Sequence, residues 1–171
     1  MFDNPPVLYV GSFSKTLVPA LRVGYLVVPE QVVEPVLWAK QVSGGEAPLL
    51  TQATIAEFIE SGHFSRHLRR MRQLYRDKWH RFQGRVAEEL GGRVRPVAES
   101  AGMHLVLEGE FDDVATHHWL RSRGFGSTPL SAHYIGSAAR SGLVMGFASA
   151  SEQQIEAGVR ALSNGLKAAA L

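Results

Sequence analysis

The clearest pattern of hydrophobic and polar positions is a long helical stripe in the middle of the chain. Its apolar residues follow one another at spacings of three or four: Phe64, Leu68, Met71, Tyr75, Trp79, Phe82, Val86 and Leu90. This spacing places them on one face of a helix of about seven turns. Gly91-Gly92 is a typical helix end. The stripe therefore predicts a long helix that packs one face against a core.

Shorter apolar runs before the stripe predict strands and helices. Residues 7–10 and 23–28 are continuous, β-branched runs that favour buried strands. Buried strands without alternation are typical of a parallel sheet covered on both faces. Helices are expected over about 30–42 and 48–60, each followed by glycine. This first part of the chain is therefore predicted to be α/β.

The part after the stripe has a different pattern. Strands are expected over 103–107 and 142–148, and a helix is expected over 112–123. A last helix begins after Ser151, because Gln154 stands three positions on and completes a capping box. This second part is predicted to be a smaller α+β lobe.

Composition excludes several classes of protein. The chain has 171 residues, of which 45% are hydrophobic and 20% are charged, as in a globular protein. It has no cysteine, which excludes disulfides, thiolate nucleophiles and Cys-based zinc sites and fits a cytoplasmic location. No apolar run approaches the ~18 residues that span a membrane, and residues 1–6 do not resemble a secretory signal. The net charge of +2 is too small to require a nucleic-acid partner.

The polar loop Gly11–Thr16 follows the first predicted strand. It is not a P-loop, because Ser14 stands where that motif requires glycine before the lysine. Ser12 and Lys15 match the S-x-x-K signature of some serine hydrolases, but the S-D-N and K-T-G strings of that chemistry are absent from the sequence. Neither a nucleotide-phosphate loop nor a serine nucleophile is therefore expected here.

A third interpretation uses every polar residue of the loop. Lys15 at the end of a buried strand is expected to be desolvated, which frees its amine to attack an aldehyde. Arg22 offers a planar fork for a phosphate group, and Ser12 and Ser14 offer hydroxyl donors. A lysine beside a phosphate clamp is what pyridoxal 5'-phosphate requires. The alternative is a solvated lysine and an arginine that pairs with a carboxylate.

The segment from Ser12 to Tyr25 closely resembles the Schiff-base segment of fold-type-I pyridoxal-phosphate enzymes, the aspartate aminotransferase superfamily. Residues 62–75, 100–105 and 142–148 resemble the small domain of one branch, the MocR subfamily of GntR-type transcriptional regulators. In that subfamily an aminotransferase-like domain serves as the effector sensor. The resemblance runs over nearly the whole chain.

The resemblance implies a fold, a cofactor and partners. The fold would be a C-terminal fragment of the pyridoxal-phosphate-dependent transferase fold, with residues 1–62 as a remnant of the large domain and 63–171 as the small domain. Lys15 would hold the cofactor covalently, and Ser12, Ser14 and Arg22 would hold its phosphate. A homodimer is expected, with an amino acid or another small molecule as effector, and DNA bound only through a separate N-terminal domain.

Two departures from the family pattern change this expectation. The phosphate-binding glycine loop, the ring-stacking aromatic, the pyridine-binding aspartate and the winged-helix DNA reader would all precede Lys15 and are missing from the sequence. The strand that carries the substrate-carboxylate arginine in aminotransferases has Val144 at that position, and Arg140 is four residues away. Weak cofactor binding is therefore expected, and a regulator is favoured over a transaminase.

Two alternatives stay open. One is the C-terminal part of a catalytic class I/II aminotransferase. The other is a cofactor-free interaction or DNA-binding fragment that uses the basic helix 63–90, since ten basic and three acidic residues lie between Arg66 and Arg95. A solvated basic face is the simpler interpretation of this charge. His63 and His67 have the spacing of a zinc pair, but Phe64 stands where the metalloprotease motif requires glutamate, so no metal site is predicted.

Overall fold

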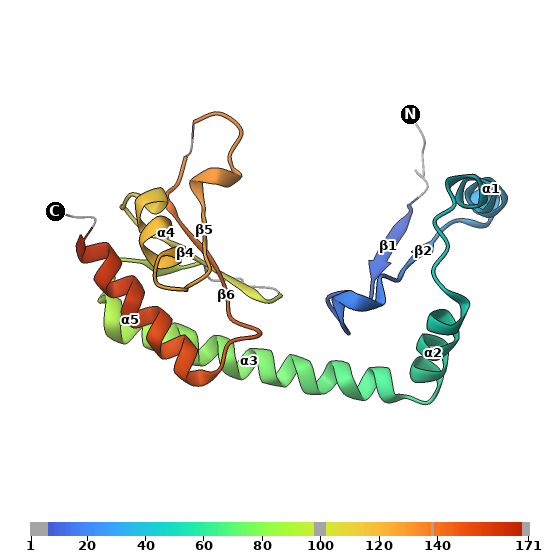
Figure 1. The fold of residues 1–171 in the computed structure, drawn as a ribbon, viewed down its shortest axis with the longest axis horizontal. Helices are drawn as coiled ribbons and strands as arrows, with labels where there is room; N and C mark the ends of the chain where they lie inside the picture. Colours follow the sequence, from blue (N-terminus) through green and yellow to red (C-terminus); the bar gives the residue numbers. More distant parts are fainter. Residues whose placement is uncertain (1–6, 98–101, 138, 169–171) are drawn as a thin grey trace. The chain divides into compact units, whose positions relative to one another are not determined.

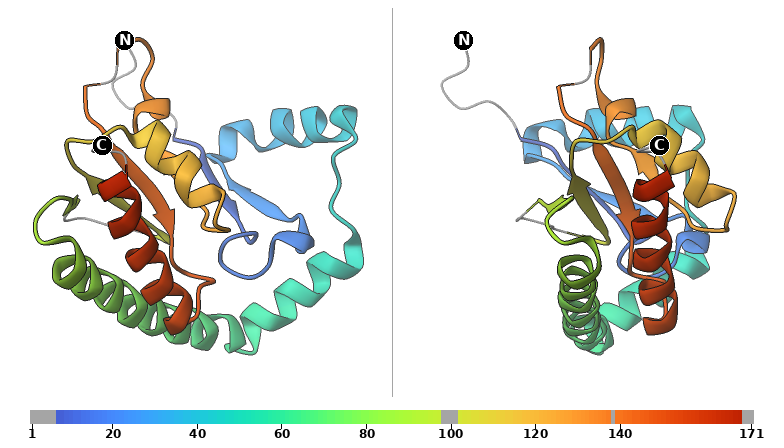
Figure 2. Two further views of the ribbon diagram at one scale, coloured as in Figure 1. Left: turned by 60° about the vertical axis from the view of Figure 1, so that its left-hand side comes forward. Right: turned by 90° about the vertical axis from the view of Figure 1, so that its left-hand side faces the viewer.

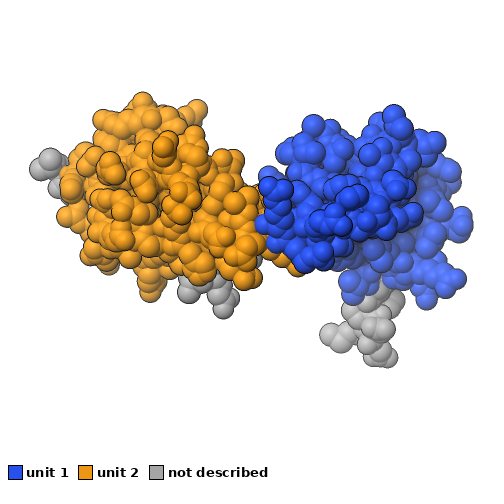
Figure 3. All heavy atoms as spheres, turned by 90° about the horizontal axis from the view of Figure 1, so that it is seen from below, with its two compact units in different colours: residues 1–70 blue, residues 71–171 orange. Residues whose placement is uncertain are grey.

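A computed structural model describes residues 7–97, 102–137 and 139–168 of the chain (Figure 1). It divides into two compact units, residues 1–70 and 71–171, which Figure 3 colours separately. The division falls inside the long helix α3 (His63–Leu90), which the hydrophobic stripe predicts within one residue at its start. Each unit has a hydrophobic cluster of its own.

The first unit begins with a β-hairpin. Strand β1 (Tyr9–Ser12) pairs with β2 (Gly24–Val27), and the short 3-10 helix η1 (Pro19–Leu21) lies between them. A second 3-10 helix, η2 (Glu30–Val32), leads into α1 (Val33–Ser43). Helix α2 (Leu49–Glu60) follows, with the first turns of α3 after it.

The hairpin corrects two predictions about these strands. The expected parallel arrangement is wrong for this pair, because β1 and β2 run antiparallel. Their connection contains only one 3-10 turn, whereas parallel neighbours need a crossover of about a dozen residues or more, usually a helix. The expected burial is also wrong for the described chain, since Val10 is 72% exposed and Val27 is 58% exposed. A hairpin without further strands or a covering helix has no layer against which to bury its faces.

The core of the first unit is small. Phe13, Val23 and Ile55 are buried, and partly buried residues of the hairpin connection and of the helices pack around them. The Phe13 ring contacts the Phe64 ring edge-on, with 5.8 Å between centroids. This cluster fixes the connection between the two strands to the beginning of α3.

The second unit contains a four-stranded antiparallel sheet in the order β3-β4-β6-β5. The strands are β3 (Arg95–Pro96), β4 (His104–Glu108), β5 (Thr128–Pro129) and β6 (Gly142–Gly146). Helix α4 (Asp113–Arg121) lies between β4 and β5 in sequence, the 3-10 helix η3 (Ser131–His133) follows β5, and α5 (Glu152–Ala168) ends the described chain. Figure 2 shows α5 beside the C-terminal half of α3. The predicted strands and helices of this lobe are confirmed, whereas the short strands β3 and β5 were not predicted.

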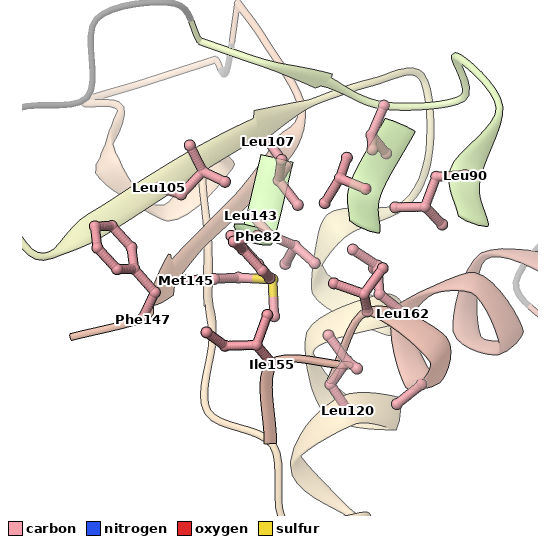
Figure 4. Close-up of a cluster of buried hydrophobic side chains, with 14 of the residues drawn as sticks. Phe82, Leu90, Leu105, Leu107, Leu120, Leu143, Met145, Phe147, Ile155 and Leu162 are labelled. Carbon is pink, nitrogen blue, oxygen red and sulfur yellow. The ribbon is translucent and has the colours of Figure 1, made fainter. Parts of the chain in front are cut away.

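One face of this sheet carries the main core. Leu105, Leu107 and Leu143 are fully buried under the helices, with Leu120 of α4 and Leu162 of α5 (Figure 4). The stripe of α3 completes the cluster at its C-terminal end, through Phe82, Val86 and Leu90. Burying a leucine side chain stabilises a fold by about 1.5–3 kcal/mol. These buried leucines all lie in the second unit, so this stabilisation is concentrated there.

Candidate functional site

The polar loop after β1 forms a single tight turn. The Phe13 carbonyl accepts a hydrogen bond from the Leu17 amide at 2.8 Å and another from the Thr16 hydroxyl at 3.4 Å. Phe13 is buried, and Leu17 packs against the same small core. These two apolar contacts fix the backbone of the turn that carries Ser14 and Lys15.

The register of the hairpin brings three of the four predicted site residues to one end. Ser12 pairs with Gly24, and the Phe13 amide donates to the Val23 carbonyl at 3.1 Å. Ser12 and Ser14 therefore flank Phe13 on one side, while Arg22 precedes Val23 on the other. The backbones approach closely, because a Cβ at Gly24 would lie 2.8 Å from the Gly11 carbonyl oxygen. The Ser14 amide also donates to the Ser12 hydroxyl at 3.2 Å.

Arg22 has an unusual backbone conformation. Its φ of 50° and ψ of 35° lie in the left-handed region, and it is the one non-glycine residue with positive φ among the described residues. This conformation costs an L-amino acid roughly 1–2 kcal/mol relative to the right-handed region. Strain of this kind clusters at binding and catalytic sites. The strained position therefore supports a functional role for the Arg22 side chain.

Lys15 does not have the predicted surroundings. Its side chain is exposed in the described chain, and so is that of Arg22. The expected desolvation of the Lys15 amine is absent, because the strands that were expected to wall it are themselves exposed. The connection between the two strands therefore carries all four predicted residues, and Lys15 and Arg22 are open to solvent.

His67 is a positioning residue that the sequence interpretation missed. Its Nε2 donates a hydrogen bond of 2.9 Å to the carbonyl oxygen of Thr16, which is 51 residues earlier in the chain. The carbonyl can only accept, so this ring nitrogen carries a proton. The bond ties α3 to the residue after Lys15. The sequence offered only the spacing of His67 from His63, from which no metal site was predicted and which gave no sign of a bond to Thr16.

Val144, the position that the family resemblance aligns with the substrate-carboxylate arginine of aminotransferases, lies in the second unit, on β6. Val144 pairs with Val106 of β4 and Thr128 of β5, so a hydrophobic side chain stands where aminotransferases have arginine. Arg140 does not replace it, because its Nη1 donates to Glu108 at 2.6 Å and its Nε donates to the Tyr134 hydroxyl at 3.0 Å. The departure seen in the sequence is therefore not compensated by Arg140.

The basic face of α3 is partly neutralised by carboxylates. Arg81 pairs with Glu152 at 2.6 Å, and Arg85 pairs with Glu88 and Glu89 at 2.6 and 2.9 Å. Within the described ranges, no cluster of three or more histidine and carboxylate side chains could hold a metal ion. The described helices also include none that is both long and apolar enough to cross a bilayer.

Sequence comparison matches nearly the whole of this chain to known proteins. The family model for aminotransferase class I and II matches residues 2–162. The HTH-type transcriptional regulator YhdI of Bacillus subtilis is 31% identical over 93% of this chain, and this covers 34% of YhdI. The probable rhizopine catabolism regulatory protein MocR of Rhizobium meliloti is 32% identical over 91% of this chain and 32% of its own length. The chain thus spans about a third of these relatives.

The fold of the chain also matches solved structures of aminotransferases. The α-aminoadipate aminotransferase LysN of Thermus thermophilus superposes with a TM-score of 0.82 and 27% identity. The match covers 95% of this chain and 42% of LysN, which was solved with N-(5'-phosphopyridoxyl)-L-leucine. The predicted fold, a fragment of the pyridoxal-phosphate-dependent transferase fold, is therefore confirmed.

Proposed function

Because the chain belongs to the aminotransferase class I and II family, we propose that it is the C-terminal part of a pyridoxal-phosphate-binding effector domain in a MocR/GntR-type transcriptional regulator. Two regulators match more than nine tenths of the chain at 31% and 32% identity. The missing carboxylate arginine at Val144 is the observation that carries the choice of regulator over enzyme. A domain that only senses its ligand does not need the arginine with which aminotransferases bind the carboxylate of an amino-acid substrate.

The residues at the end of the hairpin suit the cofactor. Pyridoxal phosphate, when bound, supplies an aldehyde and an electron-withdrawing ring. Lys15 supplies an amine for covalent attachment, while Ser12, Ser14 and Arg22 supply donors for the phosphate. The Phe13–Val23 hydrogen bond places the backbone of Arg22, the residue before Val23, next to the loop. These four residues supply no group for the ring.

The partners follow from the same proposal. The effector is a small molecule or an amino acid, the assembled regulator is a homodimer, and DNA is bound by a separate N-terminal domain. Such a regulator works in the cytoplasm. The basic face of α3 is then a solvated surface, consistent with the carboxylates that pair with Arg81 and Arg85.

Selective labelling of lysine tests cofactor binding. The chain has four lysines, Lys15, Lys40, Lys78 and Lys167. Pyridoxal phosphate is added, its bond to lysine is reduced with borohydride, and the modified peptides are quantified by mass spectrometry. We expect Lys15 to be labelled at a lower cofactor concentration than Lys40, since Ser12, Ser14 and Arg22 offer donors for the phosphate close to Lys15 in the hairpin connection.

Arg22→Ala should abolish that preference and leave Lys40 labelling unchanged, whereas Arg121→Ala, a change of an arginine in the other unit, should preserve it. Equal labelling of Lys15 and Lys40 in the wild-type chain would contradict the proposal. Release of keto acid from added amino acids would instead select the catalytic aminotransferase. Salt-sensitive retention of DNA without lysine selectivity would select the cofactor-free fragment.

A further inference from the structure

An open cavity lies in the second unit, at the end of the sheet where β4 ends and β6 begins. Its volume is about 970 Å³, within the range of small-molecule sites. It is lined by the chain after α3, by residues 108–111, by the residues before β6 and by the last turn of α5. None of Ser12, Ser14, Lys15 and Arg22 lines it, so it is a different place from the proposed cofactor loop.

A buried carboxylate organises two guanidiniums at this cavity. The side chain of Glu108 is only 9% exposed, and its two oxygens accept from Arg95 at 3.0 Å and from Arg140 at 2.6 Å. The arginine side chains are 80% and 62% exposed. One carboxylate therefore holds two arginines in place while leaving most of their N–H groups free to bind something else.

Two further cations line the cavity without such a partner. The side chains of Arg93 and Lys167 make no hydrogen bond or ion pair to any other residue that the structure describes. Together with Arg95 and Arg140 they give four positive charges, against two negative charges from Glu108 and Glu110. A surplus of two positive charges around a concave space attracts multivalent anions more strongly than monovalent ones.

We propose that this cavity is a second ligand site, which binds a small multivalent oxyanion carrying phosphate or carboxylate groups. Arg95 and Arg140 bind it with the donors that Glu108 leaves free, and Arg93 and Lys167 neutralise its remaining charge. Arginine forks match both phosphate and carboxylate oxygens in geometry. Because Glu108 fixes two of the four cations beforehand, less conformational entropy is lost when the ligand binds.

Calorimetric titration of the full chain tests this site with pyrophosphate and with citrate, at one ionic strength and with acetate as the monovalent control. Saturable binding of one multivalent anion per chain is expected, with acetate at least tenfold weaker. Preference for pyrophosphate or for citrate identifies phosphoryl or carboxylate groups as the natural ligand chemistry. Arg93→Gln combined with Lys167→Gln should weaken binding about tenfold or more, since both changes remove charge without breaking a described ion pair.

Matched variants distinguish binding in this cavity from a general effect of surface charge and from binding at the cofactor loop. Arg121→Gln removes a surface charge from α4 outside the cavity, and it should leave the affinity unchanged. Arg22→Ala should also leave it unchanged, so loss of cofactor labelling and loss of anion binding are independent results. The proposal is overturned if no saturable binding occurs, if Arg22→Ala alone removes it, or if Arg121→Gln weakens it as much as the cavity variant. It is also overturned if the cavity variant only lowers the melting temperature, as expected if Lys167 does no more than stabilise the C-terminal end of α5.

Discussion

At the scale of single residues, Arg22 combines a cost in stability with a proposed role in binding. Its left-handed backbone is one that glycine adopts freely, while its guanidinium is the strongest phosphate donor in the loop. A residue that is unfavourable for the fold and suited to the ligand is what a binding site is expected to contain. Stability should therefore rise and cofactor selectivity should fall when glycine replaces this residue.

Arg22→Gly tests that opposition. It should stabilise the hairpin connection by roughly 1 kcal/mol, because glycine removes the left-handed strain, and it should abolish selective labelling of Lys15. Hydrogen exchange of the Phe13 and Leu17 amides, whose bonds close the connection, measures the first effect as about fivefold slower exchange. Arg22→Ala keeps the strain and loses the guanidinium, so it should lose selectivity without slower exchange. Faster exchange in Arg22→Gly would contradict the proposed strain at this position.

Asp113 shows a different use of a buried polar residue. It is 4% exposed, and its carboxylate accepts bonds from the Ser131 amide at 2.8 Å, the Ser131 hydroxyl at 2.7 Å and the Gly142 amide at 3.1 Å. Burial alone would raise its pKa, but these hydrogen bonds outweigh burial and lower the pKa below its ordinary value of 3.8. Asp113 thereby ties the start of α4 to the turn after β5 and to the first residue of β6.

The lowered pKa of Asp113 predicts a specific pH dependence. Its contribution to stability is complete above pH 3.8 and is lost as the pH falls through the lower pKa of the folded state. Asp113→Asn should cost about 1–3 kcal/mol near neutral pH, because a buried carboxylate loses its charge-assisted bonds. Urea unfolding at several pH values should show this deficit shrinking below pH 3.8. Asp77→Asn, which changes an exposed carboxylate on α3, should show no such trend.

At the scale of elements, the last helix illustrates how local sequence determines where a helix begins. The predicted capping box is confirmed. The backbone N–H of Gln154 donates to the Ser151 hydroxyl at 3.2 Å, and the backbone N–H of Ser151 donates to the side-chain oxygen of Gln154 at 2.8 Å. Helix α5 contributes Ile155, Val159 and Leu162 to the core. Fraying of its first turn should therefore loosen packing as well as the helix.

Ser151→Ala removes this cap. The expected cost is about 1 kcal/mol, the usual value for an N-cap hydroxyl, seen as a lower urea midpoint for the second unit. Gln153→Ala changes an exposed neighbour without a capping bond and serves as the control. An equal loss in both variants would show that the first turn of α5, and not its cap, accounts for the effect.

The elements that were predicted correctly depend on residues that lie close together in the sequence. The stripe of α3 and the cap of α5 depend on residues three or four positions apart, and both are confirmed. The pairing of β1 with β2, the bond from His67 to Thr16 and the two arginines at Glu108 join residues far apart in sequence. Single-sequence patterns carry no information about such pairs. The role of the four loop residues stays a prediction, and the exposure of Lys15 and Arg22 was not predictable, because exposure depends on what surrounds a side chain.

At the scale of the whole molecule, apolar surface is distributed unequally. The second unit buries its leucines around one sheet, whereas in the first unit Leu8, just before the hairpin, is 55% exposed, and Val10 and Leu26 in the hairpin are 72% and 54% exposed. Val10 and Leu26 are cross-strand partners, so they share one face of the hairpin. Exposed apolar strands with free edges are templates for pairing with other chains.

The chain is therefore expected to self-associate through the hairpin, and sedimentation velocity should show larger species as its concentration rises. Val10→Thr combined with Leu26→Thr should shift the distribution toward monomer, because threonine keeps the strand preference and reduces the apolar area. Val114→Thr changes an exposed valine of α4 in the other unit and should leave the distribution unchanged. If the hairpin variant associates as strongly as the wild-type chain, another surface is responsible. If it becomes monomeric and still labels Lys15 selectively, cofactor binding at the loop does not depend on contact between chains at this face.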